Sequence, residues 1–210
     1  MSQFAPPKTM LSAKNLTCVR GKRSLFSGLH FSLNEGQWLH VCGENGTGKT
    51  SLLRILAGLV KPVEGDIYWE ELPIQKNRED FHRNLLFLGH HEAIKEELSA
   101  LENLKLAAAL DGGVLPEAAA LEALWRFGLK GREDLPVYCL SAGQKRRVLL
   151  ARLQTRKAKL WILDEPFTSL DVKAVAMLSA LISQHIESGG MAILTSHQTI
   201  PIPNGRILQL

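Results

Sequence analysis

The sequence predicts an α/β protein whose core is a mainly parallel β-sheet. An apolar run, Trp38–Cys42, leads into a glycine-rich loop and then into a helical pattern. Two later apolar runs, Leu160–Leu163 and Met191–Thr195, are short and continuous, which is typical of strands buried on both faces. A helical pattern, Val172–Glu187, separates them. Such alternation of strands and helices predicts a parallel sheet flanked by helices.

The N-terminal part of the chain predicts an antiparallel β region that follows a mobile tail. Residues 1–9 contain a Pro-Pro pair and little apolar periodicity, so we expect this segment to be mobile. Strand patterns at 10–17 and 25–33 are separated by a turn at Gly21 and Lys22, and a further strand is predicted at 66–69.

The middle of the chain differs from both ends. After a strand predicted at 83–89, residues 90–145 contain apolar residues at helical spacing and no convincing strand. We therefore expect one domain over residues 10–210, with a core formed by 10–89 and 146–210 and an inserted α-helical subdomain at 90–145.

The composition excludes several classes of protein. No apolar run is long enough to span a bilayer, and no metal-ligand spacing is present. Cys18, Cys42 and Cys139 are scattered, which suits a reducing compartment with thiols as small apolar fillers. The net charge of +4 and a pI near 9.0 are modest, and no basic-aromatic cluster occurs, so we expect no nucleic-acid partner.

The loop after the apolar run Trp38–Cys42 predicts a phosphate-binding site. It fits the pattern G-x-x-x-x-G-K-[ST], and its backbone N–H groups, together with a helix N-terminus, can face a polyphosphate. We expect Lys49 to reach the β- and γ-phosphates and Thr50 to place its hydroxyl on Mg²⁺. The predicted nucleotide-binding residues of this segment are Gly43, Glu44, Asn45, Gly46, Thr47, Gly48, Lys49, Thr50 and Ser51.

Two carboxylates follow the apolar run Leu160–Leu163. Asp164 ends this strand, so it should face the crevice at the carboxyl edge of the sheet and could hold Mg²⁺ through water. Glu165 could polarise an attacking water as a general base. The structural alternative is that this pair only ends the strand.

A second candidate phosphate site precedes a helix at residues 140–144, Leu-Ser-Ala-Gly-Gln, which we call the signature segment. The Ser141 hydroxyl and the backbone N–H groups around Gly143 could face a γ-phosphate. The alternative is an ordinary helix N-cap at Ser141.

The order and spacing of these segments resemble those of the ATPase subunits of ABC transporters. The resemblance covers nearly the whole chain beyond the tail and rests on 43–50, 140–144, 160–165, 169–171 and 195–197. It implies a P-loop NTPase (RecA-like) core with an N-terminal antiparallel β part. It also implies a homodimer, arranged head to tail, in which ATP with Mg²⁺ lies between one chain's phosphate loop and the other chain's signature segment.

The same resemblance implies roles for four further groups. Glu165 is similar to the catalytic base, and His197 is similar to the histidine that contacts the γ-phosphate. Asp171 would help to link the two sites across the dimer. The inserted subdomain would couple to membrane subunits.

Two residues depart from the family pattern. His90 stands where a Gln that reaches the metal site is usual, and a neutral imidazole could accept from a water or touch Mg²⁺. Arg20 stands where an aromatic ring often stacks on adenine. A guanidinium plane can also stack on a base, and the alternative is a solvated arginine in a turn.

Within the family, the chain closely resembles the ATP-binding subunits of cytochrome c maturation systems. The stretches 84–90, 98–104, 140–147 and 161–168 carry this likeness, and the histidine in the Gln position is its most distinctive feature. The resemblance implies a peripheral protein on the cytoplasmic face of the bacterial inner membrane, associated through integral-membrane partners similar to CcmB and CcmC. ATP hydrolysis would drive haem export or the release of haem from its chaperone.

Two other functions remain open from the sequence. The chain could energise import of another substrate, because the nucleotide chemistry would be identical. It could also be a non-transport ABC ATPase that acts on nucleic acid, although such proteins usually carry two ATPase domains or a long coiled-coil insertion.

Overall fold

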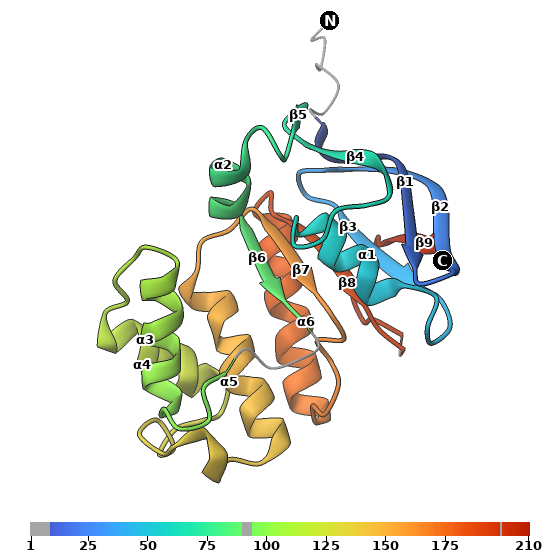
Figure 1. The fold of residues 1–210 in the computed structure, drawn as a ribbon. Coiled ribbons are helices and arrows are strands. Elements are labelled where there is room, and N and C mark those ends of the chain that lie inside the picture. Colours follow the sequence, from blue (N-terminus) through green and yellow to red (C-terminus); the bar gives the residue numbers. More distant parts are fainter. Residues whose placement is uncertain (1–8, 90–93, 198) are drawn as a thin grey trace, which may run out of the picture.

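The computed structural model describes residues 9–89, 94–197 and 199–210, and it confirms the predicted α/β class (Figure 1). His90 and most of the predicted tail lie outside the described residues. The strands are β1 Thr9–Arg20, β2 Arg23–Asn34, β3 Trp38–Cys42, β4 Glu64–Trp69, β5 Leu72–Pro73, β6 Leu85–Leu88, β7 Leu160–Leu163, β8 Met191–Thr195 and β9 Arg206–Gln209. The helices are α1 Lys49–Leu56, α2 Arg78–Arg83, α3 Ala100–Leu110, α4 Glu117–Arg126, α5 Ala142–Thr155 and α6 Val172–Glu187, with a 3-10 turn at Val137–Cys139.

The strands form two sheets. One has the order β2-β1-β4-β5 and is antiparallel, and the other has the order β6-β7-β8-β3-β9 and is parallel. Because the strands of the second sheet are parallel, the residues that follow β3, β7 and β8 meet at one edge of the sheet. This edge brings the phosphate loop, Asp164 and His197 into one region.

Side chains of the parallel sheet alternate between two hydrophobic cores. In β7, Leu160 and Ile162 belong to a core shared with α1 and the antiparallel sheet, whereas Trp161 and Leu163 belong to a core shared with α3 to α6. All four are buried, which explains why this strand reads as a continuous apolar run. Hydrophobic packing on both faces of the sheet therefore fixes the positions of the carboxyl ends of its strands.

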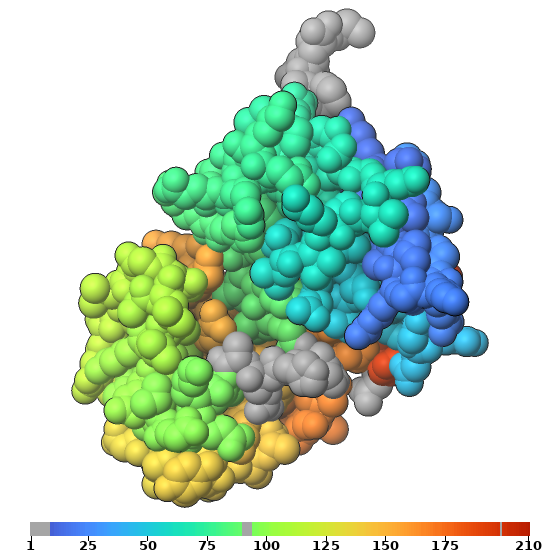
Figure 2. All heavy atoms as spheres, in the orientation of Figure 1, coloured from blue at the N-terminus to red at the C-terminus, as the bar shows by residue number. Residues whose placement is uncertain are grey.

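The helical segment forms a lobe beside the rest of the molecule (Figures 1 and 2). It contains α3, α4 and the N-terminal part of α5, and these helices pack on one another through Leu104, Ala120, Leu124 and Val148. The predicted boundary between residues 145 and 146 falls inside α5, and the division into core and insert stays a prediction.

Several elements differ from the sequence prediction, among them α2 and β5, which were not predicted. The predicted strand 83–89 begins only at Leu85, because α2 occupies Arg78–Arg83. The short strand β9 extends the parallel sheet beyond β3, and it was not predicted because most of its residues are exposed. In the described part of the chain, none of the helices has the length and apolar character needed to cross a bilayer.

Candidate nucleotide site

The phosphate loop joins β3 to α1 in the predicted strand, loop, helix order. Gly43, Gly46 and Gly48 have φ angles of +150°, +82° and +111°, a region that L side chains rarely adopt. A Cβ on Gly48 would lie 3.0 Å from Cβ of Leu25. Glycine at this position therefore allows the β1–β2 hairpin to close over the loop.

The Lys49 side chain lies back along the phosphate loop. Its Nζ donates to the carbonyl oxygen of Gly43 at 2.7 Å and to that of Glu44 at 3.2 Å. The Glu44 carbonyl also accepts from Oγ1 of Thr47 at 3.0 Å. Because Lys49 is the first residue of α1, its ammonium group lies beside the helix N-terminus, where backbone N–H groups lack intrahelical partners. This end of the site therefore concentrates positive charge and N–H donors suited to a phosphate.

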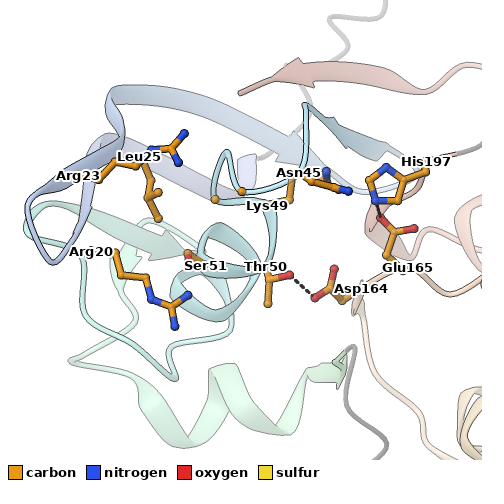
Figure 3. A pocket seen from close by; sticks show the side chains of 12 residues that line it. Arg20, Arg23, Leu25, Asn45, Lys49, Thr50, Ser51, Asp164, Glu165 and His197 are labelled. Atoms are coloured by element: carbon orange, nitrogen blue, oxygen red, sulfur yellow. Dashed lines mark hydrogen bonds and ion pairs between the residues drawn. The ribbon is translucent and has the colours of Figure 1, made fainter.

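A buried hydrogen-bond network joins the loop helix to the ends of β7 and β8. Thr50 Oγ1 donates to Oδ2 of Asp164 at 2.8 Å (Figure 3), and Thr195 Oγ1 donates to Oδ1 of the same carboxylate at 2.6 Å. Thr195 Oγ1 also accepts from the backbone N–H of Glu165 at 2.8 Å. Asp164 and Thr195 are almost fully buried. Thr195 thus fixes the positions of both acidic residues.

The backbone around Glu165 is held in an uncommon conformation. Glu165 has φ +50°, which is rare for a non-glycine residue. Arg146 Nη2 donates to the carbonyl oxygens of Asp164 at 3.1 Å and Glu165 at 2.8 Å. An arginine from α5 therefore stabilises the turn that carries the candidate base.

The Glu165 carboxylate points toward His197. Oε1 of Glu165 lies 3.4 Å from Nε2 of His197, and the two side chains are 12% and 54% exposed (Figure 3). Oε1 has no hydrogen-bond partner among the described residues. A sheltered carboxylate oxygen beside an accessible imidazole is suited to holding a water molecule.

One cavity of about 460 Å³ brings most of the predicted site residues together. It runs from the β1–β2 hairpin, past the loop, to Glu165 and His197 (Figure 3). The predicted residues that line it are Arg20, Asn45, Gly46, Gly48, Lys49, Thr50, Ser51, Asp164, Glu165 and His197. Gly43, Glu44 and Thr47 belong to the loop but do not line the cavity.

Sequence reasoning missed four residues that shape the site. Arg23 and Leu25 line the cavity, and Thr195 and Arg146 hold Asp164 and Glu165 in place. Thr195 ends the buried strand β8, and its place beside Asp164 depends on the pairing of β8 with β7. Arg23 follows Arg20 across a two-residue turn, so the hairpin pattern could have placed them together.

The signature segment does not line the cavity. Ser141 is the N-cap of α5 and accepts from the N–H of Gln144 at 3.3 Å, while Gln144 Oε1 accepts from the N–H of Ser141 at 2.9 Å. This capping box confirms the structural reading of Ser141 and leaves the functional one open. Gly143 lies close to Ser169, since an added Cβ would be 3.0 Å from its carbonyl oxygen.

Asp171 also lies outside the cavity. It caps α6 by accepting from the N–H of Ala174 at 2.8 Å, and it forms an ion pair with Arg147. The Ala174 hydrogen bond and then the Arg147 charge hold the pKa of Asp171 below its usual value.

Burial raises the pKa of the Cys42 thiol just before the loop, which keeps this thiol protonated at neutral pH.

Thr50 and Asp164 fit an ion shared with phosphate oxygens. Their oxygens lie 2.8 Å apart at the phosphate end of the cavity, and hydroxyl and carboxylate oxygens are ligands that Mg²⁺ prefers. Across residues 9–89, 94–197 and 199–210, no group of three His, Cys, Asp or Glu side chains could hold a metal ion by itself. His90, the third predicted metal residue, is outside these ranges.

Comparison with known proteins agrees with this geometry. A family model described as ABC transporter matches residues 26–168. The cytochrome c biogenesis ATP-binding export protein CcmA of Dechloromonas aromatica is 54% identical over 201 residues, covering 96% of this chain and 98% of the relative. The protein of the same name from Escherichia coli O6:H1 is 50% identical, with 96% and 95% coverage.

A solved structure shares the fold. It is a dimeric ATP-binding cassette in a post-hydrolysis state bound to ADP and Pi, with a TM-score of 0.79 and 24% identity over 90% of this chain and 88% of that chain. The match to the family model, the identity to the curated relatives and the arrangement of loop and carboxylates agree. The chain belongs to the ABC transporter ATP-binding family, in the group of the CcmA cytochrome c biogenesis proteins.

Proposed function

We propose that the chain is the ATP-hydrolysing subunit of the ABC transporter of cytochrome c maturation. The observation that carries the hydrolytic part is the single cavity that joins the phosphate loop to Asp164, Glu165 and His197. The assignment to cytochrome c maturation rests on CcmA proteins that are 54% and 50% identical to this chain over 201 residues. These relatives are named as ATP-binding export proteins of cytochrome c biogenesis.

The phosphate end of the cavity binds the triphosphate of ATP. Lys49 leaves the carbonyl groups of Gly43 and Glu44 and turns to the β- and γ-phosphates, while the first N–H groups of α1 donate to phosphate oxygens. Thr50 and Asp164 hold Mg²⁺, which supplies positive charge that offsets the charge on the phosphates. The exchange of Lys49 partners costs little, because each lost hydrogen bond is replaced by one to phosphate.

Glu165 acts as the general base and His197 contacts the γ-phosphate. Oε1 of Glu165, which accepts no hydrogen bond from the described residues, accepts a proton from the attacking water, and the turn held by Arg146 and Thr195 keeps this oxygen at the cavity. His197, half exposed beside Glu165, donates to a γ-phosphate oxygen. Asp164 is held in place by the hydroxyl groups of Thr50 and Thr195, and it does not take the proton of the attacking water.

A homodimer completes the site. Ser141 and Gly143 lie outside the cavity of their own chain, so we assign them to the γ-phosphate bound by the partner chain, with Asp171 near the contact. The dimeric fold neighbour bound to ADP and Pi supports this arrangement. Arg20 lines the cavity, and we place the adenine base of ATP beside it. For His90 we keep the role of a group that reaches water or the metal ion.

Association with the membrane depends on other subunits. We propose that it sits on the cytoplasmic face of the inner membrane and associates with integral-membrane subunits similar to CcmB and CcmC through the helical segment 90–145. ATP hydrolysis then drives haem export or the release of haem from its chaperone. The export function in the names of the relatives supports this assignment.

Complementation tests the proposal. The gene is expressed in a host that lacks its own CcmA, and c-type cytochromes are measured by haem staining. We expect the wild type to restore them and the Lys49→Ala and Glu165→Gln variants to fail at equal protein levels. If the wild-type chain hydrolyses ATP but restores no c-type cytochrome, the pathway is wrong and import of another substrate becomes the better assignment.

A further inference from the structure

We propose that His40 of β3 is a positioning residue for ATP hydrolysis, because it holds the turn that carries His197. His40 does not line the nucleotide cavity, so it acts through the backbone next to His197 and not on the nucleotide itself. This inference rests on the proposed function, from which it takes the contact of His197 with the γ-phosphate.

A hydrogen bond joins His40 to the residue that precedes His197. β3 and β8 are parallel neighbours in the sheet, and His40 lies opposite Leu194 (Figure 1). Nε2 of His40 lies 3.3 Å from the carbonyl oxygen of Ser196. A carbonyl oxygen only accepts, so Nε2 of His40 carries the hydrogen and donates it. A half-buried side chain of the central sheet thus contacts the backbone one residue before His197.

The position of His197 depends on backbone contacts of this kind. β8 ends at Thr195, so His197 lies beyond the last residue that the sheet ladder holds. Its side chain is 54% exposed and stands at the cavity beside Glu165 (Figure 3). A side chain with so little packing keeps a productive position only where neighbouring groups hold the backbone that carries it.

The chain that follows His197 is also held by β3. Trp38 precedes His40 by two residues and therefore projects from the same face of the strand. Its Nε1 donates to the carbonyl oxygen of Pro203 at 2.8 Å. An added Cβ on Gly205 would lie 2.2 Å from the Trp38 ring, so the backbone there packs directly against the indole. One face of β3 thus contacts the chain before and after His197, and His40 makes the contact nearest to it.

Position 40 needs a hydrogen-bond donor at the reach of Nε2. The amide nitrogen of glutamine lies at nearly the same distance from Cβ as Nε2 of histidine, and it carries hydrogens. The amide nitrogen of asparagine is one bond nearer to the backbone, and leucine has no donor. His40→Gln should therefore keep the bond to Ser196, whereas His40→Asn and His40→Leu should lose it.

Steady-state ATP hydrolysis by the full chain tests the inference, at a temperature where circular dichroism shows every variant folded. We expect His40→Leu and His40→Asn to lower kcat by about tenfold, since small misplacements of a contacting group have effects of this size. KM for ATP should stay within about twofold, because the phosphate loop is unchanged. His40→Gln should retain most of the wild-type kcat.

His185→Leu is the matched control. Nε2 of His185 also lies close to a backbone carbonyl oxygen, that of Met191 at 3.2 Å, but at the opposite end of β8. Like His40, His185 is half-buried, and it does not line the nucleotide cavity. The control variant should therefore keep kcat within about twofold of the wild type, as expected for a site that is not coupled to His197.

A double-mutant cycle with His197 separates positioning from a general structural effect. In the His197→Ala background, His40→Leu should cause no further loss of kcat, because the imidazole that it positions is absent. A structural role would lower kcat by the same factor in both backgrounds.

Three results would overturn the inference: wild-type kcat in His40→Leu and His40→Asn, a glutamine variant as slow as the asparagine variant, or equal losses in the two backgrounds. If His40→Leu does not fold, the comparison of His40→Gln with His40→Asn decides. Wild-type turnover by His197→Ala would overturn the role of His197 in the proposed function and the inference with it. That failure is distinguishable, because the first three results can arise while His197→Ala remains slow.

Discussion

The guanidinium group of Arg147 forms an ion pair with the carboxylate of Asp171, and this contact joins α5 to the N-terminal end of α6. The same carboxylate caps α6 through the N–H of Ala174. Near the start of α5, Gly143 lies against the carbonyl oxygen of Ser169, which has φ +63°. The helix α5, which begins within the signature segment, is thus joined to the loop that follows Glu165 by one ion pair and approaches it closely at a second point.

Because of this tie, replacing Arg147 should affect turnover more than nucleotide binding. Arg147→Gln removes the charge that orients Asp171 and leaves the cavity untouched. We expect kcat of ATP hydrolysis to fall several-fold with KM nearly unchanged, and Arg147→Lys to recover part of the loss. Arg126→Gln is the matched control, because Arg126 pairs with Glu122 on an exposed helix face where such pairs contribute little. Equal kcat in the wild type and Arg147→Gln would contradict the coupling.

Asp171 should make stability depend on pH in the acid range. Its folded pKa lies below the ordinary value of a free aspartate because of the Ala174 hydrogen bond and the Arg147 charge. A depressed pKa stabilises the folded state above the unfolded pKa, and this stabilisation disappears as the pH falls through the folded pKa. Urea unfolding of the wild type and Asp171→Asn should therefore differ at pH 6 and converge toward pH 2. A difference that stays constant over this range would argue against the ion pair and cap.

Thr195 should be needed for both stability and catalysis. Thr195→Val keeps the shape but removes the donor to Asp164 and the acceptor for the Glu165 N–H. Both threonine and carboxylate are buried, so we expect a loss of about 1–3 kcal/mol in the free energy of unfolding. ATPase activity should fall further than this loss explains, because Asp164 and Glu165 are no longer held. Thr195→Ser keeps the hydroxyl and should retain most activity, and a Val variant with wild-type kcat would refute the positioning role.

The sequence predicted the parallel core well because its strands and helices carry strong local signals. β7, β8 and α6 have the predicted bounds, since each is a continuous apolar run or a long helical pattern. β9 has a mostly exposed sequence and exists because β3 offers a free edge, which no local pattern encodes. α2 has six residues and one buried side chain, Phe81, so its periodicity is too short to detect.

The candidate site was predictable where chemistry follows a motif and less so where it depends on register. Lys49, Thr50, Asp164 and Glu165 follow buried strands and were predicted with their neighbours. Thr195 matters because Leu194 pairs with Leu163 in the sheet, which places Thr195 beside Asp164, the residue that follows β7. That pairing is a tertiary fact, and the sequence of β8 alone could not reveal it.

Lys49 and Glu165 should separate nucleotide binding from hydrolysis. Nζ of Lys49 donates to the loop carbonyl groups of Gly43 and Glu44, so Lys49→Ala should fold normally and lose affinity for ATP by tenfold or more, about the contribution of a charge-assisted hydrogen bond. Glu165→Gln keeps the size of the side chain and removes its basicity, so ATP should still bind while turnover falls by about 10²-fold or more. Because ATP then persists at the interface, size-exclusion chromatography with ATP should show a dimer for Glu165→Gln and a monomer for Lys49→Ala. Wild-type turnover by Glu165→Gln would assign the base to another residue, and ATP-dependent dimerisation of Lys49→Ala would show that the loop lysine is not needed to bind the triphosphate.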